Sequence, residues 1–405
     1  MGKKIILTNQ HCDNRGDESA TIGLIEQIYA NFGNDAKITM FKQTKDYQFI
    51  PDEYGIEERN MDRDFSFMFQ SMMWILFKYI HLDIRGILSK RMKKFIKLHE
   101  EADIILSSCG GPYIGDIYFN HEILHIFYVL IPELLGKIVA FAAPSMGPFK
   151  KKIANPIRRS ILKRAKLIVL RDKVSFEYVN EFLKQPEKVF LAADACFANE
   201  IADKAKLEER ENVIGFTPLE YKYPSASNRE AEVEKYKVSL IELFDKLMEE
   251  DKSLKIEFFP QLYNKHSDIK LIEEFKSRMK YGDRTIVFSD KASGPLQQME
   301  IGKMKMMIAT RYHSAVFSCK MHVPVICIAY EHKAFAMMDS FDLSDCVIDI
   351  NEMTSDVLNE KYQHIKSNYD SIYERQVKKL PLVTEKAKST IKLAKEVYDG
   401  EFGNK

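Results

Sequence analysis

MMIATRYHSAVFSCKM, residues 306–321, indicates how this chain folds. The short apolar run MMIAT predicts a buried β-strand, and AVFSCKM has the spacing of a helix. The strand therefore passes directly into a helix, with Arg311, His313 and Ser314 at the junction. When strands are parallel, such junctions lie at the carboxyl edge of the sheet, where α/β proteins bind ligands.

Similar apolar runs alternate with helix-length segments along most of the chain. This alternation predicts parallel sheets covered by helices on both faces. The predicted strands are KIILT (4–8), KITMF (37–41), DIILSS (103–108), KIVAFAA (137–143), LIVLRD (167–172), KVFLA (188–192), VIGFTPL (213–219), LKIEFFPQ (254–261), TIVFSD (285–290), MMIATR (306–311), PVICIAY (324–330) and CVIDI (346–350).

The length of 405 residues suits two domains. A charged stretch poor in apolar residues, 203–213, interrupts the pattern, which then restarts. We place an N-terminal domain at residues 1–203 and a C-terminal domain at residues 204–405, with a C-terminal helix. Two Rossmann-like domains facing each other leave one large cleft, the usual place for a ligand.

Composition excludes several classes of protein. The formal net charge of +1 gives no overall field for nucleic acid, so we expect no nucleic-acid partner. The six cysteines are scattered without a C-x-x-C pair, which favours reduced thiols in the cytoplasm over a disulfide framework or thiolate metal site. The start, MGKKIILTNQ, has too short an apolar run for a secretory signal and predicts a first strand.

The junction after strand 306–310 has the chemistry of an anion site. Arg311 offers a planar fork that suits carboxylate or phosphate, His313 a proton donor near neutral pH, and Ser314 a hydroxyl. The helix start adds free N–H groups. The alternative is a surface arginine beside a structural histidine.

A second junction follows the strand at 167–170. Asp172 could cap the next helix, and Arg171 could be a second anion contact. The alternative is a purely structural turn.

Two polar loops follow the first and third predicted strands. In the first loop, Gly16 allows a tight turn, Asp17 is a candidate N-cap, and Asn14 and Asp17 suit a hydroxyl-rich ligand. It matches neither G-x-G-x-x-G nor a P-loop. The second loop, 108–116, combines Gly110 and Gly111 with Asp116, which could bind or deprotonate a sugar hydroxyl, although a plain loop is the alternative.

The segment NHEILH, 120–125, contains H-E-x-x-H, a spacing used by zinc peptidases. No third ligand is evident after it, so we expect no metal site. The segment follows the glycine loop closely and should open a helix. We expect His121 to contact the acceptor and His125 to pack in the core.

Taken in order, these motifs resemble the polysaccharide pyruvyl transferase family over about residues 4 to 340. The matching elements are N-R-G-D-E-x-A (14–20), S-x-G-G-x-x-x-x-D (108–116), Gly147-Pro148-Phe149, R-D-x-x-S (171–175), Asp194-Ala195-Cys196-Phe197, R-Y-H-S-A (311–315) and V-P-V-I-x-I-x-Y-x-x-K (323–333).

The resemblance implies a two-domain fold similar to GT-B glycosyltransferases. It also implies that phosphoenolpyruvate donates a pyruvate ketal to two hydroxyls of a glycan or lipid-linked saccharide. In this family the R-x-H element is implicated in binding phosphoenolpyruvate, and it falls here on Arg311 and His313, with Arg171 nearby. Two positions depart from the family pattern, Ala195 and Tyr312.

The chemistry of phosphoenolpyruvate assigns roles to these residues. A carboxylate and a phosphate on one small enol need at least two cationic contacts, which Arg311, Arg171 and Lys333 can supply. We expect His313 to act as the acid, and Asp116 or Asp17 as the base. Phosphoenolpyruvate is then a co-substrate, and no metal or other cofactor is expected.

Two other functions fit the same architecture, a glycosyltransferase that uses a nucleotide sugar and a non-catalytic saccharide-binding relative.

The apolar segment 65–81 is too short to span a bilayer. It predicts either a core or interdomain helix or an interfacial helix resting on anionic lipid. With the basic segment 150–164, it could hold the protein at the cytoplasmic membrane face if the acceptor is lipid-linked.

Overall fold

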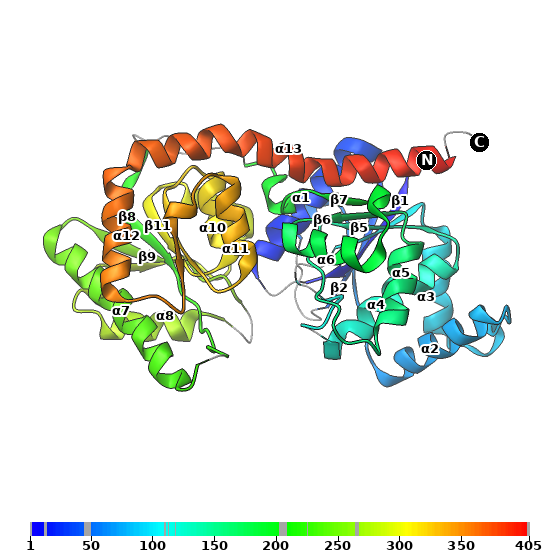
Figure 1. The fold of residues 1–405 in the computed structure, drawn as a ribbon. Coiled ribbons are helices and arrows are strands. Elements are labelled where there is room, and N and C mark those ends of the chain that lie inside the picture. Colours follow the sequence, from blue (N-terminus) through cyan, green and yellow to red (C-terminus); the bar gives the residue numbers. More distant parts are fainter. Residues whose placement is uncertain are drawn as a thin grey trace. The chain divides into compact units, whose positions relative to one another are not determined.

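A computed structural model describes residues 2–11, 14–43, 50–108, 111, 113–117, 119–201, 209–224, 226–263 and 267–402. The chain forms two compact units, each built on a parallel sheet flanked by helices (Figure 1). Unit 1 comprises Met1–Cys12, Ala20–Asn199 and Thr384–Lys405, and unit 2 comprises Asp13–Ser19 and Glu200–Val383. The predicted pair of parallel-sheet α/β domains is confirmed. The predicted boundary at 203/204 and the site residue Gly110 lie outside the described residues.

The seven strands of unit 1 lie in the order β3-β2-β1-β4-β5-β6-β7, all parallel. Each of the six apolar runs predicted in this half forms a strand. β4 and β5 are buried along their whole length, as expected for a sheet covered on both faces. The strands are β1 (Lys4–Gln10), β2 (Lys37–Lys42), β3 (Glu57–Asn60), β4 (Ile104–Ser107), β5 (Ile138–Ala142), β6 (Leu167–Leu170) and β7 (Val189–Leu191).

The helices of unit 1 pack a common aromatic core. Phe95 of α3 and Tyr128 of α4 pack on Phe41 of β2, and Phe67 of α2 packs on Phe95 and Tyr128. The ring centroids of these pairs are 5.0 to 5.8 Å apart. The helices are α1 (Arg15–Phe32), whose residues up to Ser19 group with unit 2, α2 (Phe65–Tyr79), α3 (Lys90–Glu101), α4 (Phe119–Leu134), α5 (Asn155–Arg164) and α6 (Lys173–Leu183), with 3-10 turns at Asp52–Tyr54, Arg85–Ile87, Pro186–Lys188 and Ala195–Phe197.

The last helix, α13 (Tyr369–Phe402), confirms the predicted C-terminal helix. Its final part, from Thr384, groups with unit 1, although we assigned it to the C-terminal domain. The physical reason is apolar burial, since Tyr398 is buried against Phe32 at 5.8 Å between ring centroids and against the ammonium of Lys3 at 5.0 Å.

Unit 2 holds six parallel strands in the order β10-β9-β8-β11-β12-β13. All six apolar runs predicted in this half form these strands. They are β8 (Glu211–Thr217), β9 (Lys255–Phe258), β10 (Thr285–Val287), β11 (Met304–Ala309), β12 (Val325–Ala329) and β13 (Val347–Asp349). The helices are α7 (Arg229–Glu250), α8 (Ile269–Arg278), α9 (Gly294–Ile301), α10 (Tyr312–Lys320), α11 (His332–Ser340) and α12 (Ser355–Ser367), with 3-10 turns at Gly282–Arg284 and Ser344–Cys346.

Each sheet has one point where the strand order reverses. In unit 1 the chain builds outward from β1 through β2 and β3, then returns to place β4 on the other side of β1. Unit 2 does the same at β8 and β11. In open α/β sheets, ligands bind outside the carboxyl ends of the strands at such switch points. The fold therefore marks the residues after β1 and β4, and those after β8 and β11, as candidate site residues.

In the part of the chain that the structure describes, no helix combines the length and the apolar character needed to cross a bilayer. The apolar segment 65–81 forms α2, which ends at Tyr79.

Candidate functional site

Arg311 stands at the switch point of unit 2, directly after β11. Its Nη2 pairs with the carboxylate of Asp268, and its Nε donates to the carbonyl of Pro218, at the end of β8, at 3.3 Å. Asp268 is buried and also accepts hydrogen bonds from the backbone N–H of Gln261 and Leu262, both at 2.9 Å. The guanidinium is thereby held in one orientation, and no described residue engages its Nη1.

His313 lies one residue into α10 and contacts the start of α1. A Cβ on Gly16 would stand 1.9 Å from Cγ and 2.0 Å from Nδ1 of His313, far inside van der Waals contact. Only glycine therefore lets the first turn of α1 lie against this ring. The N-R-G-D-E and R-Y-H-S motifs, almost 300 residues apart in the chain, form one site in unit 2.

Arg15 anchors this first turn in unit 2. It is buried, pairs with Glu18 at 2.7 Å, and lies over the ring of Tyr263 at 4.1 Å. Its backbone N–H donates to the carbonyl of Gln261 at 3.1 Å. The arginine and the glutamate of the motif thus hold α1 in place, so that Gly16 reaches His313.

The N-cap of α1 is Asn14, and our prediction of Asp17 as the cap is wrong. The Asn14 Oδ1 accepts the backbone N–H of Asp17 at 2.8 Å, and the Asn14 Nδ2 donates to the Asp17 carboxylate at 2.7 Å. Asp17 therefore occupies the third helical position, where it completes a reciprocal capping arrangement. Both side chains lie in unit 2.

Lys333 and Ser314 make different kinds of contact near this turn. Lys333, at the start of α11, pairs with Glu331 at 2.7 Å and lies 5.3 Å from the ring centre of Tyr312. Ser314 is fully buried, and its Oγ donates to the Arg311 carbonyl at 2.6 Å. This contact gives Ser314 a role in shaping the turn that presents Arg311 and His313.

The second junction lies in unit 1, so the described contacts do not bring Arg171 together with Arg311. Arg171 is buried, pairs with Asp194 at 2.8 Å and donates to Ser145 Oγ at 3.0 Å. Asp172 caps α6 by accepting the backbone N–H of Ser175 at 2.8 Å, which confirms the capping interpretation.

Asp116 is held by several donors in unit 1. It accepts hydrogen bonds from Arg158 Nη1 at 2.7 Å and from the backbone N–H of Lys150 at 2.6 Å and Lys151 at 3.1 Å. Burial alone raises the pKa of Asp116, but these donors outweigh burial and lower it. Such an arrangement stabilises the carboxylate and opposes proton uptake. The role of Asp116 as a base stays a prediction.

The H-E-x-x-H motif opens α4, as expected, but its three side chains diverge. Glu122 accepts two hydrogen bonds from Arg158, at 2.7 and 2.9 Å, and one from the backbone N–H of Gly115 at 2.8 Å. His125 is fully buried against Gln43 at 2.9 Å, and burial lowers its pKa to about 3. His121 is exposed. Among the described residues the motif forms no cluster with metal-ligand geometry.

The switch point of unit 1 carries an imidazole–phenol pair. His11, just after β1, stacks on Tyr113 with ring centroids 4.8 Å apart and hydrogen-bonds to its hydroxyl. Tyr113 packs in turn on His125 at 4.5 Å, and its backbone N–H donates to the Gly111 carbonyl at 2.9 Å. These rings lie beside the predicted acceptor residues Gly111 and His121.

Sequence reasoning missed Asp268, Arg15 and His11 as contributors to these two sites. Asp268 belongs to no motif, and only the fold brings it to Arg311. Arg15 lies inside a recognised motif but has no partner within reach by spacing except Glu18. His11 carried one usable signal, its position directly after the first predicted strand.

Comparison with known proteins agrees with this architecture. The model of the family described as polysaccharide pyruvyl transferase matches residues 14–332. The amylovoran biosynthesis protein AmsJ of Erwinia amylovora is 23% identical over 417 residues, covering 92% of this chain and 94% of that protein.

Solved structures confirm the fold class. A structure of a putative UDP-N-acetylglucosamine 2-epimerase from Listeria monocytogenes superposes with a TM-score of 0.64 at 12% identity, covering 100% of this chain and 98% of that chain. A glycosyltransferase from Rickettsia africae gives a TM-score of 0.59 at 13% identity, with both chains covered completely. At these identities the likeness concerns the fold alone, which is GT-B-like as expected.

Proposed function

The chain belongs to the polysaccharide pyruvyl transferase family, and from this premise we propose that it transfers the pyruvyl group of phosphoenolpyruvate. The acceptor is a sugar in a polysaccharide precursor or lipid-linked saccharide, and the products are a pyruvate ketal and phosphate. The name of the Erwinia relative, a biosynthesis protein, supports an acceptor of this kind.

The observation that carries this proposal is the juxtaposition of Arg311 and His313 at the switch point of unit 2. Arg311 is oriented by Asp268 while its Nη1 faces no described partner, so the guanidinium can bind one anionic group of phosphoenolpyruvate. The start of α1, held on His313 through Gly16, places the positive end of a helix dipole beside the same imidazole. Lys333, also in unit 2, is the second cation that we propose contacts phosphoenolpyruvate.

In the proposed reaction His313 donates a proton to the methylene carbon of phosphoenolpyruvate, which becomes a methyl group. One sugar hydroxyl adds to the cationic C2 carbon, its proton passes to the base, and the C2–O bond to phosphate breaks. The second hydroxyl then adds to the oxocarbenium carbon left at C2, its proton returns to His313, and the ketal closes. One phosphoenolpyruvate and one diol give one ketal and one phosphate, with no oxidant, water or metal consumed.

We propose Asp17 as the base in preference to Asp116. The hydrogen bonds to Asp116 lower its pKa, whereas Asp17 follows Gly16, the residue that touches the His313 ring. Asn14, next to Asp17, joins Gly110, Gly111, Asp116 and His121 as proposed acceptor contacts. Arg171, which pairs with Asp194 in unit 1, stays a proposed donor contact.

The test measures donor binding before turnover, because binding needs no acceptor. Phosphoenolpyruvate should raise the melting temperature of the protein, and Arg311→Ala and His313→Ala should each reduce that rise. Lys270→Ala, an exposed lysine of α8, is the matched control. Stabilisation by UDP-sugars and not by phosphoenolpyruvate would favour a nucleotide-sugar glycosyltransferase. A saccharide effect without any turnover would favour a non-catalytic relative.

Activity is then measured as phosphate release with phosphoenolpyruvate and a panel of free and lipid-linked galactosides, glucosides and mannosides. Ketal formation is read by the mass of the acceptor. Release that needs both substrates, and that His313→Ala abolishes, is the expected result.

A further inference from the structure

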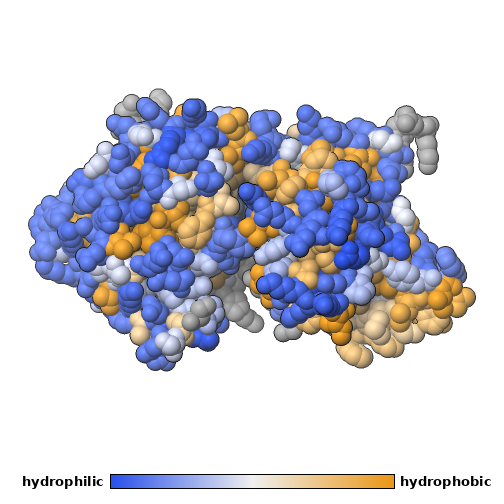
Figure 2. Space-filling view, in the orientation of Figure 1, coloured by the Kyte–Doolittle hydropathy of each residue, from blue (hydrophilic) through white to orange (hydrophobic). Residues whose placement is uncertain are grey.

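One face of α2, in unit 1, is apolar and exposed. The buried face of this helix carries Phe67, Trp74 and Ile75. The opposite side carries a stripe whose members are between 45% and 84% exposed, which continues past the helix end. Figure 2 shows this stripe as a hydrophobic patch at the edge of unit 1. We call it the α2 ridge: Phe65, Phe69, Met72, Leu76, Ile80 and Leu82.

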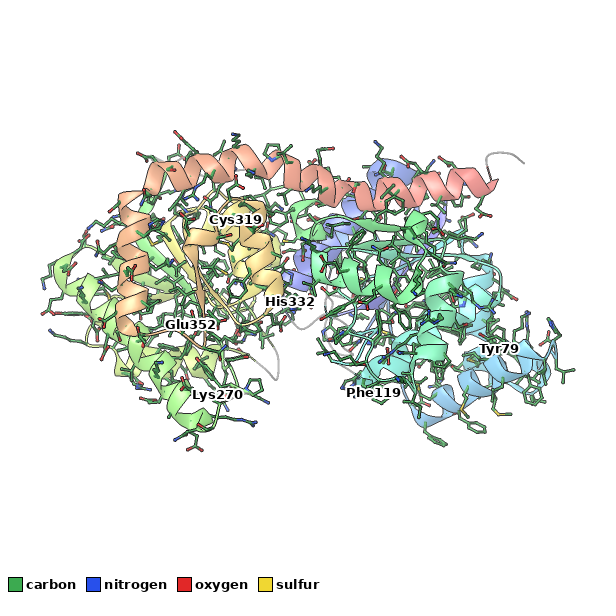
Figure 3. The ribbon with its side chains drawn as sticks, in the orientation of Figure 1. Tyr79, Phe119, Lys270, Cys319, His332 and Glu352 are labelled. Atoms are coloured by element: carbon green, nitrogen blue, oxygen red, sulfur yellow. The ribbon has the colours of Figure 1, made fainter. Side chains whose placement is uncertain are left out.

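A contiguous apolar surface of this kind marks an interaction site, because isolated exposed apolar residues are normal but a continuous stripe is not. The stripe has the spacing of one helical face, so a flat partner can cover it without any change of the helix. Tyr79, on the same helix (labelled in Figure 3), is half exposed.

Basic residues surround the ridge. Residues 62–101 contain eight lysines and arginines and five acidic residues, a net charge of +3 in a chain whose total is +1. Lys90, Lys93, Lys94 and Lys97 of α3 are all exposed. The first turn of α3 adjoins α2, since the backbone N–H of Ser89 donates to Gln70 Oε1 at 2.8 Å.

The basic helix α5 meets the other end of α2. The Tyr79 hydroxyl bonds to Ser160 Oγ at 2.9 Å, and the guanidinium of Arg164 lies over the Tyr79 ring at 5.5 Å. α5 has no acidic residue and four basic ones, of which Arg158 is buried in ion pairs with Glu122 and Asp116, while Arg159, Lys163 and Arg164 are exposed. The ridge is therefore bordered by cations at both ends, which selects an anionic partner.

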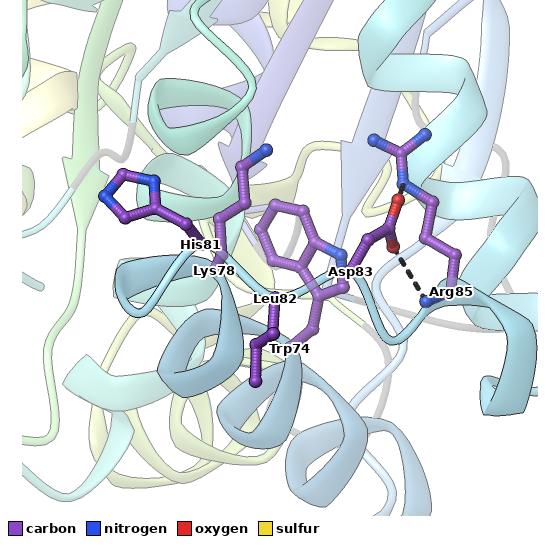
Figure 4. A pocket seen from close by; sticks show the side chains of 6 residues that line it. All are labelled: Trp74, Lys78, His81, Leu82, Asp83 and Arg85. Carbon is purple, nitrogen blue, oxygen red and sulfur yellow. Dashed lines mark hydrogen bonds and ion pairs between the residues drawn. The ribbon is translucent and has the colours of Figure 1, made fainter.

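A pocket opens at the carboxyl end of α2 (Figure 4). Arg85 there is compensated by Glu100 at 2.6 Å and Asp83 at 3.5 Å. Lys78, by contrast, has as its described contact only the ring of Trp74, at 5.9 Å. Lys78 is thus a cation available to a phosphate beside an apolar surface. The six lining residues are Trp74, Lys78, His81, Leu82, Asp83 and Arg85.

We infer that unit 1 docks through the α2 ridge on the surface of a bilayer that contains anionic phospholipid. The ridge lies at the boundary of headgroups and acyl chains, and Lys78 with the α3 lysines contacts lipid phosphates. The apolar stripe and the exposed basic residues of the neighbouring helices α3 and α5 match an anionic amphiphile in both respects. The inference does not depend on the proposed reaction, because docking needs neither donor nor acceptor.

Vesicle binding by the full chain tests this inference. The protein is sedimented with vesicles of phosphatidylcholine alone and of three parts phosphatidylcholine to one part phosphatidylglycerol. We expect binding to the anionic vesicles only, weakened by added salt.

Matched variants separate the ridge from general surface effects. Phe65→Ser with Leu76→Ser, and Lys78→Glu, alter exposed or half-buried positions and should leave the circular dichroism unchanged. Each should weaken vesicle binding, the double variant by at least about tenfold. Leu382→Ser and Lys270→Glu change exposed residues of unit 2 and should bind as the wild type does (Figure 3).

The inference is overturned if the protein binds neither kind of vesicle or binds both equally. It is also overturned if the ridge variants bind anionic vesicles as well as the wild type does. Capture of an acidic protein by the ridge in the absence of vesicle binding would also overturn it. Phosphate release measured with a soluble acceptor is read separately, so failure of docking and failure of the proposed reaction are distinguishable.

Discussion

The Cα of Gly16 lies against the imidazole of His313, so closely that a Cβ at position 16 would stand 1.9 Å from the ring. This contact joins the first turn of α1 to the turn that follows β11. It explains why a glycine stands in the N-R-G-D-E motif, and it makes the position a sensitive probe of the site.

Gly16→Ala should therefore displace either the helix start or the imidazole. We expect a loss of stability of about 1–3 kcal/mol from overpacking, with a larger loss of phosphoenolpyruvate binding. Urea unfolding measures the first and calorimetric titration the second. Gly86→Ala is the matched control, because a Cβ there meets nothing within 4 Å. Unchanged donor binding in Gly16→Ala would show that the contact between Gly16 and His313 does not contribute to the donor site.

Arg311→Lys keeps the charge but removes the fork that spans Asp268 and the Pro218 carbonyl. We expect phosphoenolpyruvate to bind about ten- to a hundredfold more weakly, because a charged hydrogen bond and its fixed orientation are lost. Calorimetric titration gives the dissociation constant. Affinity equal to wild type would show that Arg311 serves only to hold Asp268.

Arg158 has no solvent exposure in its side chain and joins Glu122 to Asp116. Arg158→Leu leaves the Glu122 carboxylate buried without its cation, so we expect a loss of about 3–5 kcal/mol in the free energy of unfolding. The double variant Arg158→Leu, Glu122→Leu should recover part of that loss. A stable single variant would contradict the assignment of Glu122 to this ion pair.

Metal analysis of the same proteins checks the H-E-x-x-H motif. Because Glu122 is occupied by Arg158 and His125 is buried, we expect no zinc to copurify in proportion to the chain. One zinc per chain, lost in His121→Ala, would reverse this interpretation.

Glu257, in β9, gives a pH dependence of stability. Burial, with Glu300 and Glu211 nearby, raises its pKa to about 7. The folded state thus holds a proton that the unfolded state releases above about pH 4.5, so stability falls as pH rises from 4.5 to 7. Glu257→Gln should be more stable than wild type at pH 8 by about 1–2 kcal/mol, and equal to it near pH 5. Parallel pH profiles in urea unfolding would contradict this.

The strands show how much of the fold the local sequence pattern predicts. Twelve strands coincide with apolar runs. Central strands such as β4 and β5 are buried on both faces, so they must be apolar throughout. β3, with the sequence EERN, was not predicted, since its polar residues carry no such signal. It forms because its backbone pairs with β2 at the sheet edge, where Glu58 meets the Lys42 ammonium.

The cap of α1 shows the limit of reasoning from single residues. Asn14 and Asp17 are both good capping residues, and only the backbone geometry assigns Asn14 to the cap and Asp17 to the third position. Glu122 is a second example. The H-E-x-x-H spacing is compatible with a metal site, but in the structure the Glu122 carboxylate pairs with Arg158.

From the sequence alone, the alternation of apolar runs determined the two parallel sheets, and the order of motifs determined the family. These features are local or ordered along the chain, so they can be read without coordinates. Only the tertiary structure decided that Gly16 meets His313, that Asp268 orients Arg311, and that the apolar stripe of α2 is left uncovered. Each of these depends on which surfaces meet after folding, and sequence separation carries no information about that.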